Sequence, residues 1–390
     1  AIVDPATGRL DLRVRGALSD EPVFVTDAAA PEYWRGAVYD HYDGVAWTLT
    51  GPTAPTGDWT VVSTTGVSSR AGISTQQAPA DPDAAAGAAG TSRTDSVQIV
   101  SAQVADVVFA PGRATSYTGP GVVSVDVDGN PRLQVPATGA PVAREDDVTS
   151  TLPAVPSGSA GASSALDTTT GPAGDPRWTQ LPTDLPKRVT ALGVQLAGHA
   201  TSRSAAVKAV DDYLQANESY DLDAPLPAVG DDVVDDFLFV SHQGFCEQFA
   251  TAAVVLLRSA GVPARLVTGY AFGDTTSDPG QRIMRGSDAH AWVQVWYPGV
   301  GWVSSDPTAS AAVTHPDGQA AAVIMPVETT SAVAPAVGPS ASSPPSPSPF
   351  ASSFARLSAT PSLLRRIGIV AAIAGLVLIV RLAVVSGRRW

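Results

Sequence analysis

Apolar and polar residues alternate in short stretches through the first 150 residues of the chain, and Gly, Pro and Asp separate these stretches. Such alternation is typical of strands that have one face in a core and the other in solvent. The turn-forming pair Asp43-Gly44 predicts a hairpin over residues 38–49. We therefore predict a β-rich N-terminal domain, residues 1–150. Clear examples of the alternation are residues 22–26, 34–39, 97–101 and 122–127.

The pattern changes after this region. Residues 151–180 are rich in Ser, Ala, Thr and Gly, which predicts a flexible linker. Apolar residues at helical spacing then predict helices over residues 186–199 and 201–217. A third helix is predicted over residues 245–260, because Gly244 precedes the periodic positions and the sequence Gly261-Val-Pro follows them.

Strand patterns follow the third helix. Residues 264–272 form an apolar run, and residues 290–297 alternate with His290, Trp292 and Gln294 on one face. The sequence PGVG predicts a turn, and residues 302–305 are predicted to form the strand that runs back. A helix on an antiparallel sheet predicts an α+β fold, with a second domain over residues 181–315.

The C-terminal part has two further patterns. Residues 316–362 are rich in Ala, Pro and Ser and predict a disordered spacer, because they offer little apolar surface to bury. Residues 363–385 are long and apolar enough for one transmembrane helix, and residues 386–390 form a short basic tail. An amphipathic or buried helix is the alternative for the apolar segment. Arginines flank it on both sides, so charge does not determine its orientation.

Composition and charge narrow the range of possible functions. The formal net charge of −13 argues against nucleic acid as a partner, since phosphate binding needs clustered Lys and Arg. The single cysteine, Cys246, excludes an intrachain disulfide. The chain starts with Ala1 and has no recognisable signal peptide, so we expect that its amino end was cut from something longer.

Cys246, His290 and Asp306 follow one another in an order that suits a nucleophile, a base and an orienting carboxylate. Cys246 falls in the first turn of a predicted helix, where unpaired N–H groups and the helix dipole favour a thiolate. Its own backbone N–H is a candidate oxyanion donor.

Structural explanations compete with this chemistry. A lone buried cysteine is usually a small hydrophobic residue, an Asp before Pro is often a turn former, and Asp288 is a competing carboxylate. A tight hairpin through residues 298–301 would also place Asp306 opposite residue 293 or 294. That position is roughly 10–13 Å from His290 along the strand, so a triad requires a bulge or another register.

The segments GFCEQFATAAVVLLRSAGVPARLVTGY and DAHAWVQVWYPGVGWVSSDPT resemble the core of the transglutaminase-like superfamily. The resemblance implies a papain-type fold with a Cys-His-Asp triad at Cys246, His290 and Asp306. More loosely, the chain resembles bacterial membrane-bound TgpA-like proteins, and residues 33–47 fit the region before their catalytic domain. Their N-terminal transmembrane helices are missing here, which implies a fragment or a shorter form. An upstream oxyanion donor is also implied, with Gln243 and Tyr220 as candidates.

The resemblance implies a membrane-anchored, extracytoplasmic thiol enzyme that transfers acyl groups through a Cys246 thioester on glutamine or amide groups. Its partners would be protein or peptide substrates of the cell envelope, and the bilayer through the C-terminal helix. A cysteine peptidase or amidase and a non-catalytic scaffold remain the alternatives. We expect no cofactor and no metal, since Asp274 and Asp278 are too sparse for a calcium site.

Overall fold

The computed structural model describes residues 8–14, 18–28, 33–49, 57–65, 73–79, 90–125, 130–134, 144–153, 175–298 and 300–308. The chain divides into two compact units, Ala1–Thr330 and Ser331–Trp390, and every described residue belongs to the first. The predicted spacer, transmembrane segment and basic tail therefore lie outside the described residues, as do residues 154–174 of the predicted linker. Among the helices of the described ranges, none is long and apolar enough to cross a membrane.

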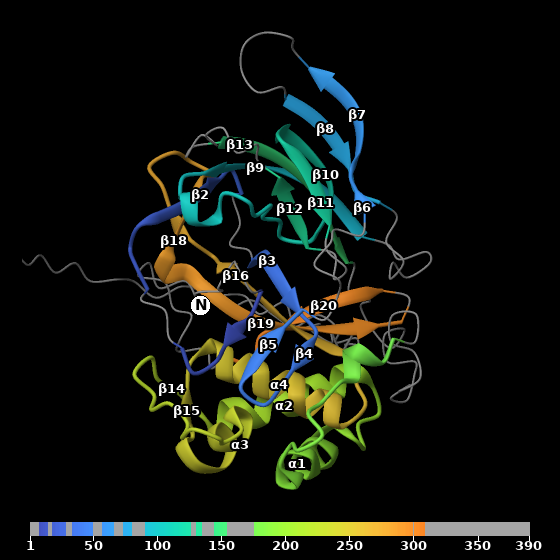
Figure 1. Ribbon diagram of the computed structural model, residues 1–390, viewed down its shortest axis with the longest axis vertical. Coiled ribbons are helices and arrows are strands. Elements are labelled where there is room, and N and C mark those ends of the chain that lie inside the picture. The colour runs from blue at the N-terminus through green and yellow to red at the C-terminus, as the bar shows by residue number, and fades with distance from the viewer. Residues whose placement is uncertain are drawn as a thin grey trace, which may run out of the picture. The chain divides into compact units, whose positions relative to one another are not determined.

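Strands dominate the N-terminal part, as the alternating pattern predicts (Figure 1). Six of them join β17 and β18, which come from later in the chain, in an eight-stranded antiparallel sheet in the order β17-β18-β2-β9-β13-β10-β8-β7. Phe24 on β2 and Phe109 stack at a ring-centroid distance of 4.6 Å in the core beneath this sheet. The strands are β2 (Pro22–Thr26), β7 (Thr60–Thr65), β8 (Ile73–Gln77), β9 (Gly90–Ile99), β10 (Arg113–Pro120), β13 (Arg144–Pro153), β17 (Asp274–Thr275) and β18 (Arg282–Arg285).

Smaller sheets and helical turns occur in both parts of the chain. Strands β1, β5 and β4 form one three-stranded sheet, β12, β11 and β6 form another, and β14 pairs in parallel with β15. These elements are β1 (Leu10–Asp11), β4 (His41–Tyr42), β5 (Ala46–Thr48), β6 (Gly57–Asp58), β11 (Val122–Val125), β12 (Pro131–Gln134), β14 (Ser219–Tyr220) and β15 (Gln243–Gly244), with helical turns η1 (Ala102–Val104), η3 (Pro176–Thr179), η4 (Phe237–Ser241) and η5 (Gly286–Asp288).

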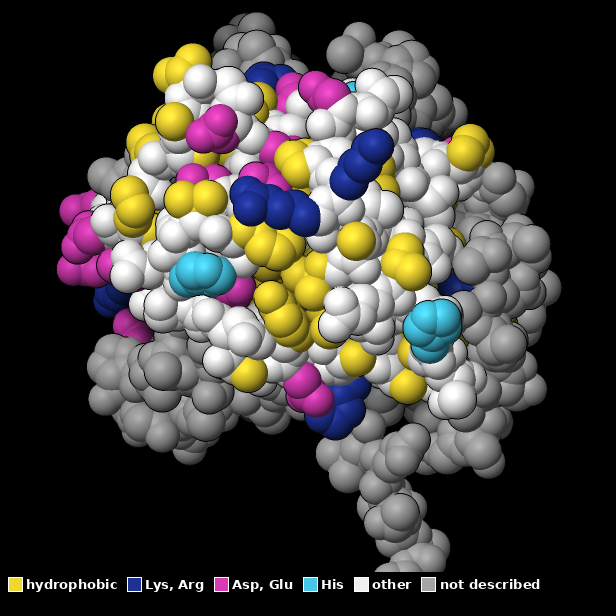
Figure 2. All heavy atoms as spheres, turned by 90° about the horizontal axis from the view of Figure 1, so that it is seen from below, with side chains coloured by type: hydrophobic (Ala, Val, Ile, Leu, Met, Phe, Trp, Pro, Cys, Tyr) yellow, Lys and Arg dark blue, Asp and Glu magenta, His cyan; other side chains and the backbone are white. Residues whose placement is uncertain are grey.

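The helices α1 (Lys187–Ala197) and α2 (Arg203–Asn217) confirm the two predicted from periodicity. The short helix α3 (Val233–Asp236) precedes η4, and α4 (Cys246–Ser259) confirms the third predicted helix. Residues 246–258 of α4 are all buried, because α1 and α2 pack on one side of it and a sheet on the other. Seen from below in Figure 2, apolar side chains gather in the middle of the surface on this helical side, and Val194 of α1 is 42% exposed.

The sheet against α4 has four antiparallel strands in the order β20-β19-β16-β3. These are β3 (Tyr33–Tyr39), β16 (Ala264–Ala271), β19 (Ala289–Tyr297) and β20 (Gly301–Ser305). The helix-on-antiparallel-sheet arrangement agrees with the predicted α+β class. The edge strand β3, however, comes from the β-rich part of the chain.

Strands pass between the two halves of the chain in both directions. β3 pairs with β16 in the sheet below α4, while β17 and β18 join the N-terminal eight-stranded sheet. At a bulge in the β3–β16 pairing, a Cβ on Gly269 would lie 2.0 Å from the Trp34 carbonyl oxygen. Glycine therefore permits this close approach, and the two halves build each other's sheets.

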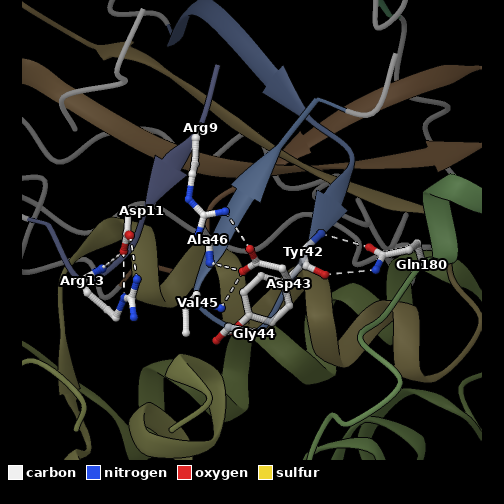
Figure 3. Close-up of polar contacts among 9 residues, drawn as sticks. All are labelled: Arg9, Asp11, Arg13, Tyr42, Asp43, Gly44, Val45, Ala46 and Gln180. Carbon is white, nitrogen blue, oxygen red and sulfur yellow. Dashed lines mark hydrogen bonds and ion pairs between the residues drawn. The ribbon is translucent and has the colours of Figure 1, made fainter. Parts of the chain in front are cut away.

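The predicted hairpin is confirmed as β4 and β5, and it is tied to neighbouring elements (Figure 3). Gly44 has a φ of +100°, which the turn requires. The Asp43 carboxylate accepts two backbone N–H groups of the turn, at 3.0 and 2.7 Å, and a 2.7 Å bond from Arg9. The Gln180 side chain bonds both the N–H and the carbonyl of Tyr42, at 3.0 Å each. Through Arg9 and Gln180, the hairpin is thus hydrogen-bonded to residues next to β1 and next to η3.

The C-terminal end of α4 is held by a buried arginine. Arg258 donates to the carbonyl oxygens of Ala264 at 2.9 Å, Asp40 at 2.7 Å and Gln180 at 2.8 Å. It therefore joins α4 to β16, to the end of β3 and to η3. Burial lowers its pKa to about 9, with Asp40 acting in the opposite direction.

Replacing Gly193 on α1 by alanine tests the packing of α1 on α4. A Cβ at this position would lie 2.5 Å from the Leu256 carbonyl oxygen and 2.6 Å from Ser259 Cβ. Alanine favours a helix by about 1 kcal/mol over glycine. We nevertheless expect Gly193→Ala to lower the free energy of unfolding by about 1–3 kcal/mol, because α1 must move away from α4. Denaturant unfolding measures the change, with exposed Gln195→Ala as the control; a gain in stability would contradict this packing.

Candidate active site

Cys246 is the first residue of α4, as the sequence predicts, and it is 7% exposed. The backbone at Phe245 is extended, and its N–H donates to the Gln248 side chain at 3.1 Å. A Cβ on Gly244 would lie 2.8 Å from the ring of Phe237, so only glycine fits before the helix. These local contacts explain why the helix begins at the cysteine.

His290 lies at the start of β19, where it pairs with Gly269 of β16, and it is 8% exposed. Asp306 follows directly after Ser305, the last paired residue of β20. The expectation that Asp306 lies opposite residue 293 or 294 is wrong. Tyr297 pairs with Gly301 across a three-residue loop, so Asp306 falls in register with Trp292. A diagonal neighbour across a strand pair is within reach of a side chain, so no bulge is needed.

The two side chains meet in the core. His290 Nε2 lies 2.8 Å from Asp306 Oδ2, and Asp306 is 5% exposed. The other carboxylate oxygen, Oδ1, accepts the backbone N–H of Thr308 at 2.9 Å. The carboxylate is therefore fixed on both oxygens.

Electrostatics agree with an ion pair. Burial alone lowers the pKa of His290, but the charge and hydrogen bond of Asp306, with those of Cys246, raise it to about 10. Burial raises the pKa of Asp306, but the charge and hydrogen bond of His290 and the bonds from Thr308 hold it below its ordinary value. The structure thus brings Cys246, His290 and Asp306 together, with the imidazole between the other two.

Tyr33 also belongs to this cluster, and sequence reasoning missed it. Its hydroxyl donates to Asp306 Oδ2 at 2.7 Å, and its ring packs on His290 at a centroid distance of 5.9 Å. Burial, and then the neighbouring Asp306, raise the pKa of Tyr33, so it stays a donor. The Trp292 ring stacks on His290 at 6.3 Å and 15° and also packs against Tyr33, at a centroid distance of 5.1 Å. The alternating pattern of residues 34–39 indicates a strand, but not that this strand pairs with β16, whose other edge pairs with the strand that carries His290.

The two candidate oxyanion donors lie on the short parallel pair that leads to α4. Gln243 on β15 is exposed, and Tyr220 on β14 is partly buried with its ring 6.3 Å from that of Phe249. Tyr220 pairs with Gly244, two residues before the cysteine. Their role as donors stays a prediction.

Asp274 forms an ion pair with Arg285 at 3.3 Å. In the part of the chain that the structure describes, no group of three or more His, Cys, Asp or Glu side chains is arranged to hold a metal ion.

Comparison with known proteins agrees with this geometry. Residues 190–307 match the transglutaminase-like superfamily. The chain is 41% identical over 139 residues to the uncharacterized protein YebA of Bacillus subtilis, a match that covers 34% of this chain and 19% of that protein. It is 49% identical over 82 residues to a protein-glutamine gamma-glutamyltransferase of Pseudomonas aeruginosa, covering 21% of this chain and 12% of that protein. The matches thus span less than a fifth of either relative.

The fold is similar to two crystal structures of the periplasmic domain of TgpA from Pseudomonas aeruginosa. The structure bound to ethylmercury has a TM-score of 0.53 at 25% identity, covering 74% of this chain and 90% of that chain. The other has a TM-score of 0.55 at 24% identity, covering 77% and 93%. The likeness therefore extends well beyond residues 190–307, into the β-rich part.

Removal of the Asp306 charge tests the ion pair. In Asp306→Asn we expect the pKa of His290 to fall from about 10 towards the ordinary 6.5, because burial is then opposed by Cys246 alone. NMR titration of the imidazole measures this change.

The same replacement predicts a pH-dependent loss of stability. The raised His290 pKa contributes stability below about pH 6.5 that is lost as the pH rises through about 10. The lowered Asp306 pKa contributes stability that is lost in acid, below its ordinary 3.8. The cost of Asp306→Asn, roughly 3–5 kcal/mol for breaking a buried pair, should therefore be largest between these limits. A cost that is equally large above about pH 11 would contradict the pair.

Proposed function

We propose that this TgpA-like, transglutaminase-like protein is a thiol enzyme that transfers an acyl group from a glutamine side chain through a thioester on Cys246. The observation that carries the proposal is the buried imidazole of His290, held between Cys246 and Asp306 with a pKa of about 10. A histidine that keeps its proton beside the sulfur suits an enzyme that must protonate a poor leaving group such as ammonia. The glutamine donor is taken from the relative in Pseudomonas aeruginosa, which bears that activity in its name.

In the first half-reaction the thiolate of Cys246 attacks the carboxamide carbon of glutamine. The carbonyl electrons move onto oxygen, and the backbone N–H of Cys246 is the candidate donor to the resulting oxyanion, since N–H groups of a first helical turn have no intrahelical acceptor. His290 then gives its proton to the departing nitrogen as the C–N bond breaks. Ammonia leaves, and a thioester and a neutral imidazole remain.

In the second half-reaction neutral His290 takes a proton from the incoming nucleophile, which attacks the thioester. The C–S bond breaks, and the thiolate and the imidazolium form again. A primary amine as the nucleophile gives an isopeptide cross-link, and water gives glutamate. Throughout, Asp306 keeps the Nε2 proton of His290 directed towards itself, so that the other ring nitrogen faces the sulfur.

We place the activity outside the cytoplasm and at a membrane. The two matching structures are of a periplasmic domain, and residues 363–385 are long and apolar enough for a C-terminal span. In an exported protein a single, unpaired thiol gains little as a structural residue, so its presence at Cys246 supports a catalytic role. The substrates would then be proteins or peptides of the cell envelope, and the bilayer would be a second partner.

Mass spectrometry with a glutamine-containing peptide and a primary amine tests this function. The wild-type protein should give a conjugate whose mass is the sum of the two substrate masses minus the mass of one ammonia. We expect Cys246→Ala to abolish the product, and His290→Ala to lower kcat by about 10³-fold or more, as for other paired nucleophiles and bases. The exposed His199→Ala is the matched control and should retain full activity.

The other outcomes identify the alternatives. Glutamate in place of the conjugate means deamidation, and a cut backbone means a cysteine peptidase or amidase. Activity that survives Cys246→Ala would rule out the thioester. A wild-type protein that gives no product, and whose Cys246 resists thiol-reactive probes near neutral pH, would favour a non-catalytic scaffold.

Tyr33→Phe tests the contribution of the β-rich part to catalysis. The change removes one hydrogen bond to the Asp306 carboxylate and keeps the ring that packs on His290. We expect kcat to fall about tenfold, near 1.4 kcal/mol, which is close to the lower end of the range of about 1.5–3 kcal/mol for a bond to a charged group. KM should stay the same, because Tyr33 contacts the triad side chains. The control is Tyr270→Phe, because the ring of Tyr270 packs against Phe24 and Phe109 instead. Equal losses of kcat in both variants would mean that Tyr33 has only a packing role.

A further inference from the structure

One buried carboxyl group near the triad has no part in the mechanism above. Asp211 lies on α2 and is 3% exposed. Its Oδ2 accepts a hydrogen bond of 2.6 Å from the hydroxyl of Ser305. Ser305 immediately precedes Asp306, so this carboxyl group is bonded to the residue next to the triad carboxylate.

The position of Ser305 in the strand makes this bond important. Ser305 is the last residue of β20 that pairs with β19, opposite Val293. After it come Asp306 and then Pro307, which has no N–H to donate to a ladder. The bond to Asp211 therefore ties the end of the strand to α2 at the point where the backbone ladder stops.

We propose that Asp211 is a positioning residue for the triad, which holds the backbone at Asp306 through Ser305 and places a second negative charge behind the His290–Asp306 pair. The proposal rests on the thiol chemistry proposed above. A small displacement of Asp306 would rotate the imidazole away from the sulfur, and proton transfer is sensitive to such changes. The charge of Asp211 adds to that of Asp306 and favours the protonated imidazole.

The surroundings of Asp211 determine when it is charged. Burial raises its pKa to about 7, and the hydrogen bond from Ser305 opposes this only in part. Above neutral pH the bond is charge-assisted and strong, and below it the carboxyl group is neutral and the bond weakens. The charged and titratable groups that act on this region are Asp306 at the end of β20, Lys208, Asp212 and Arg203 on α2, and Tyr297 at the end of β19.

The same raised pKa makes Asp211 a cost to stability at neutral pH. A carboxyl group with a folded pKa above its unfolded value of 3.8 stabilises the fold in acid, and this contribution is lost as the pH rises through about 7. Replacement by a neutral residue of the same shape should therefore raise Tm above neutral pH. Two roles for Asp211 can therefore be told apart. Replacing a residue that serves the reaction slows catalysis while it stabilises the protein, and replacing a residue that serves only the fold does not combine these two effects.

Asp211→Asn is the test, because the asparagine oxygen can still accept from Ser305 but carries no charge. We expect kcat at about pH 8 to fall about tenfold, with KM changed less than about twofold. The inflection near pH 7 in the pH profile of kcat should disappear, and Tm at about pH 8 should rise. Asp212→Asn is the matched control: this neighbour is 60% exposed and pairs with Lys208, so kcat should stay the same. The inflection should persist, moved only slightly to lower pH, because the charge of Asp212 raises the pKa of Asp211.

Ser305→Ala gives a second, opposite signature. It removes the hydrogen bond that lowers the pKa of Asp211, so kcat should fall while the inflection remains and moves to higher pH. An inflection that persists unchanged in Asp211→Asn, or a loss confined to KM, would overturn the proposal.

One measurement does not depend on the identity of the substrate. NMR titration of His290 should show a lower pKa in Asp211→Asn than in the wild type, because a nearby negative charge is lost, and no change in Asp212→Asn. If the wild type transfers no acyl group, the proposed function fails while this shift can still be read. An unchanged His290 titration in Asp211→Asn overturns the role of Asp211, whatever the reaction.

Discussion

The buried pair of His290 and Asp306 is the interaction on which the rest of the site depends. Two charges removed from water are costly unless every remaining donor and acceptor is satisfied. Here the carboxylate accepts from His290, Tyr33 and the Thr308 backbone, at 2.7–2.9 Å. Those partners come from β3, β19 and the segment after β20, so the pair exists only once these strands are assembled. The groups that surround His290 beside Cys246 are therefore brought together by the assembled sheet and not by the helix of Cys246 alone.

This dependence gives the β-rich half a direct role. A separate substrate-binding module would leave the triad complete without it, yet β3 forms one edge of the sheet under α4 and supplies Tyr33. In return, β17 and β18 complete the eight-stranded sheet. The likeness to the TgpA periplasmic domain covers about three quarters of the chain, which agrees with two halves that fold together. Under the proposed function, the β-rich half would then contribute directly to the catalytic site through Tyr33.

Much of the local structure could be predicted from the sequence, because it depends on neighbouring residues. Helical periodicity and glycine boundaries located α1, α2 and α4, and Cys246 at the start of α4 followed from them. The hairpin at Asp43-Gly44 has its own turn signal. The pairing of His290 with Asp306 was predicted by their order and by family resemblance, while the strand register argued against it.

Only the tertiary structure decided the contacts between distant positions. The three-residue loop before Gly301 moved Asp306 one residue closer to His290 than a tight hairpin does, and turn length is poorly encoded in a Pro-Gly-Val-Gly sequence. Tyr33 and Asp306 are 273 positions apart, and Asp211 and Ser305 are 94 apart. No periodicity connects residues at such separations, because strand pairing and helix packing are chosen by the whole core. The sequence by itself thus determined the main helices and strands and the position of Cys246 at the start of α4, and the assembled fold determined which groups hold His290.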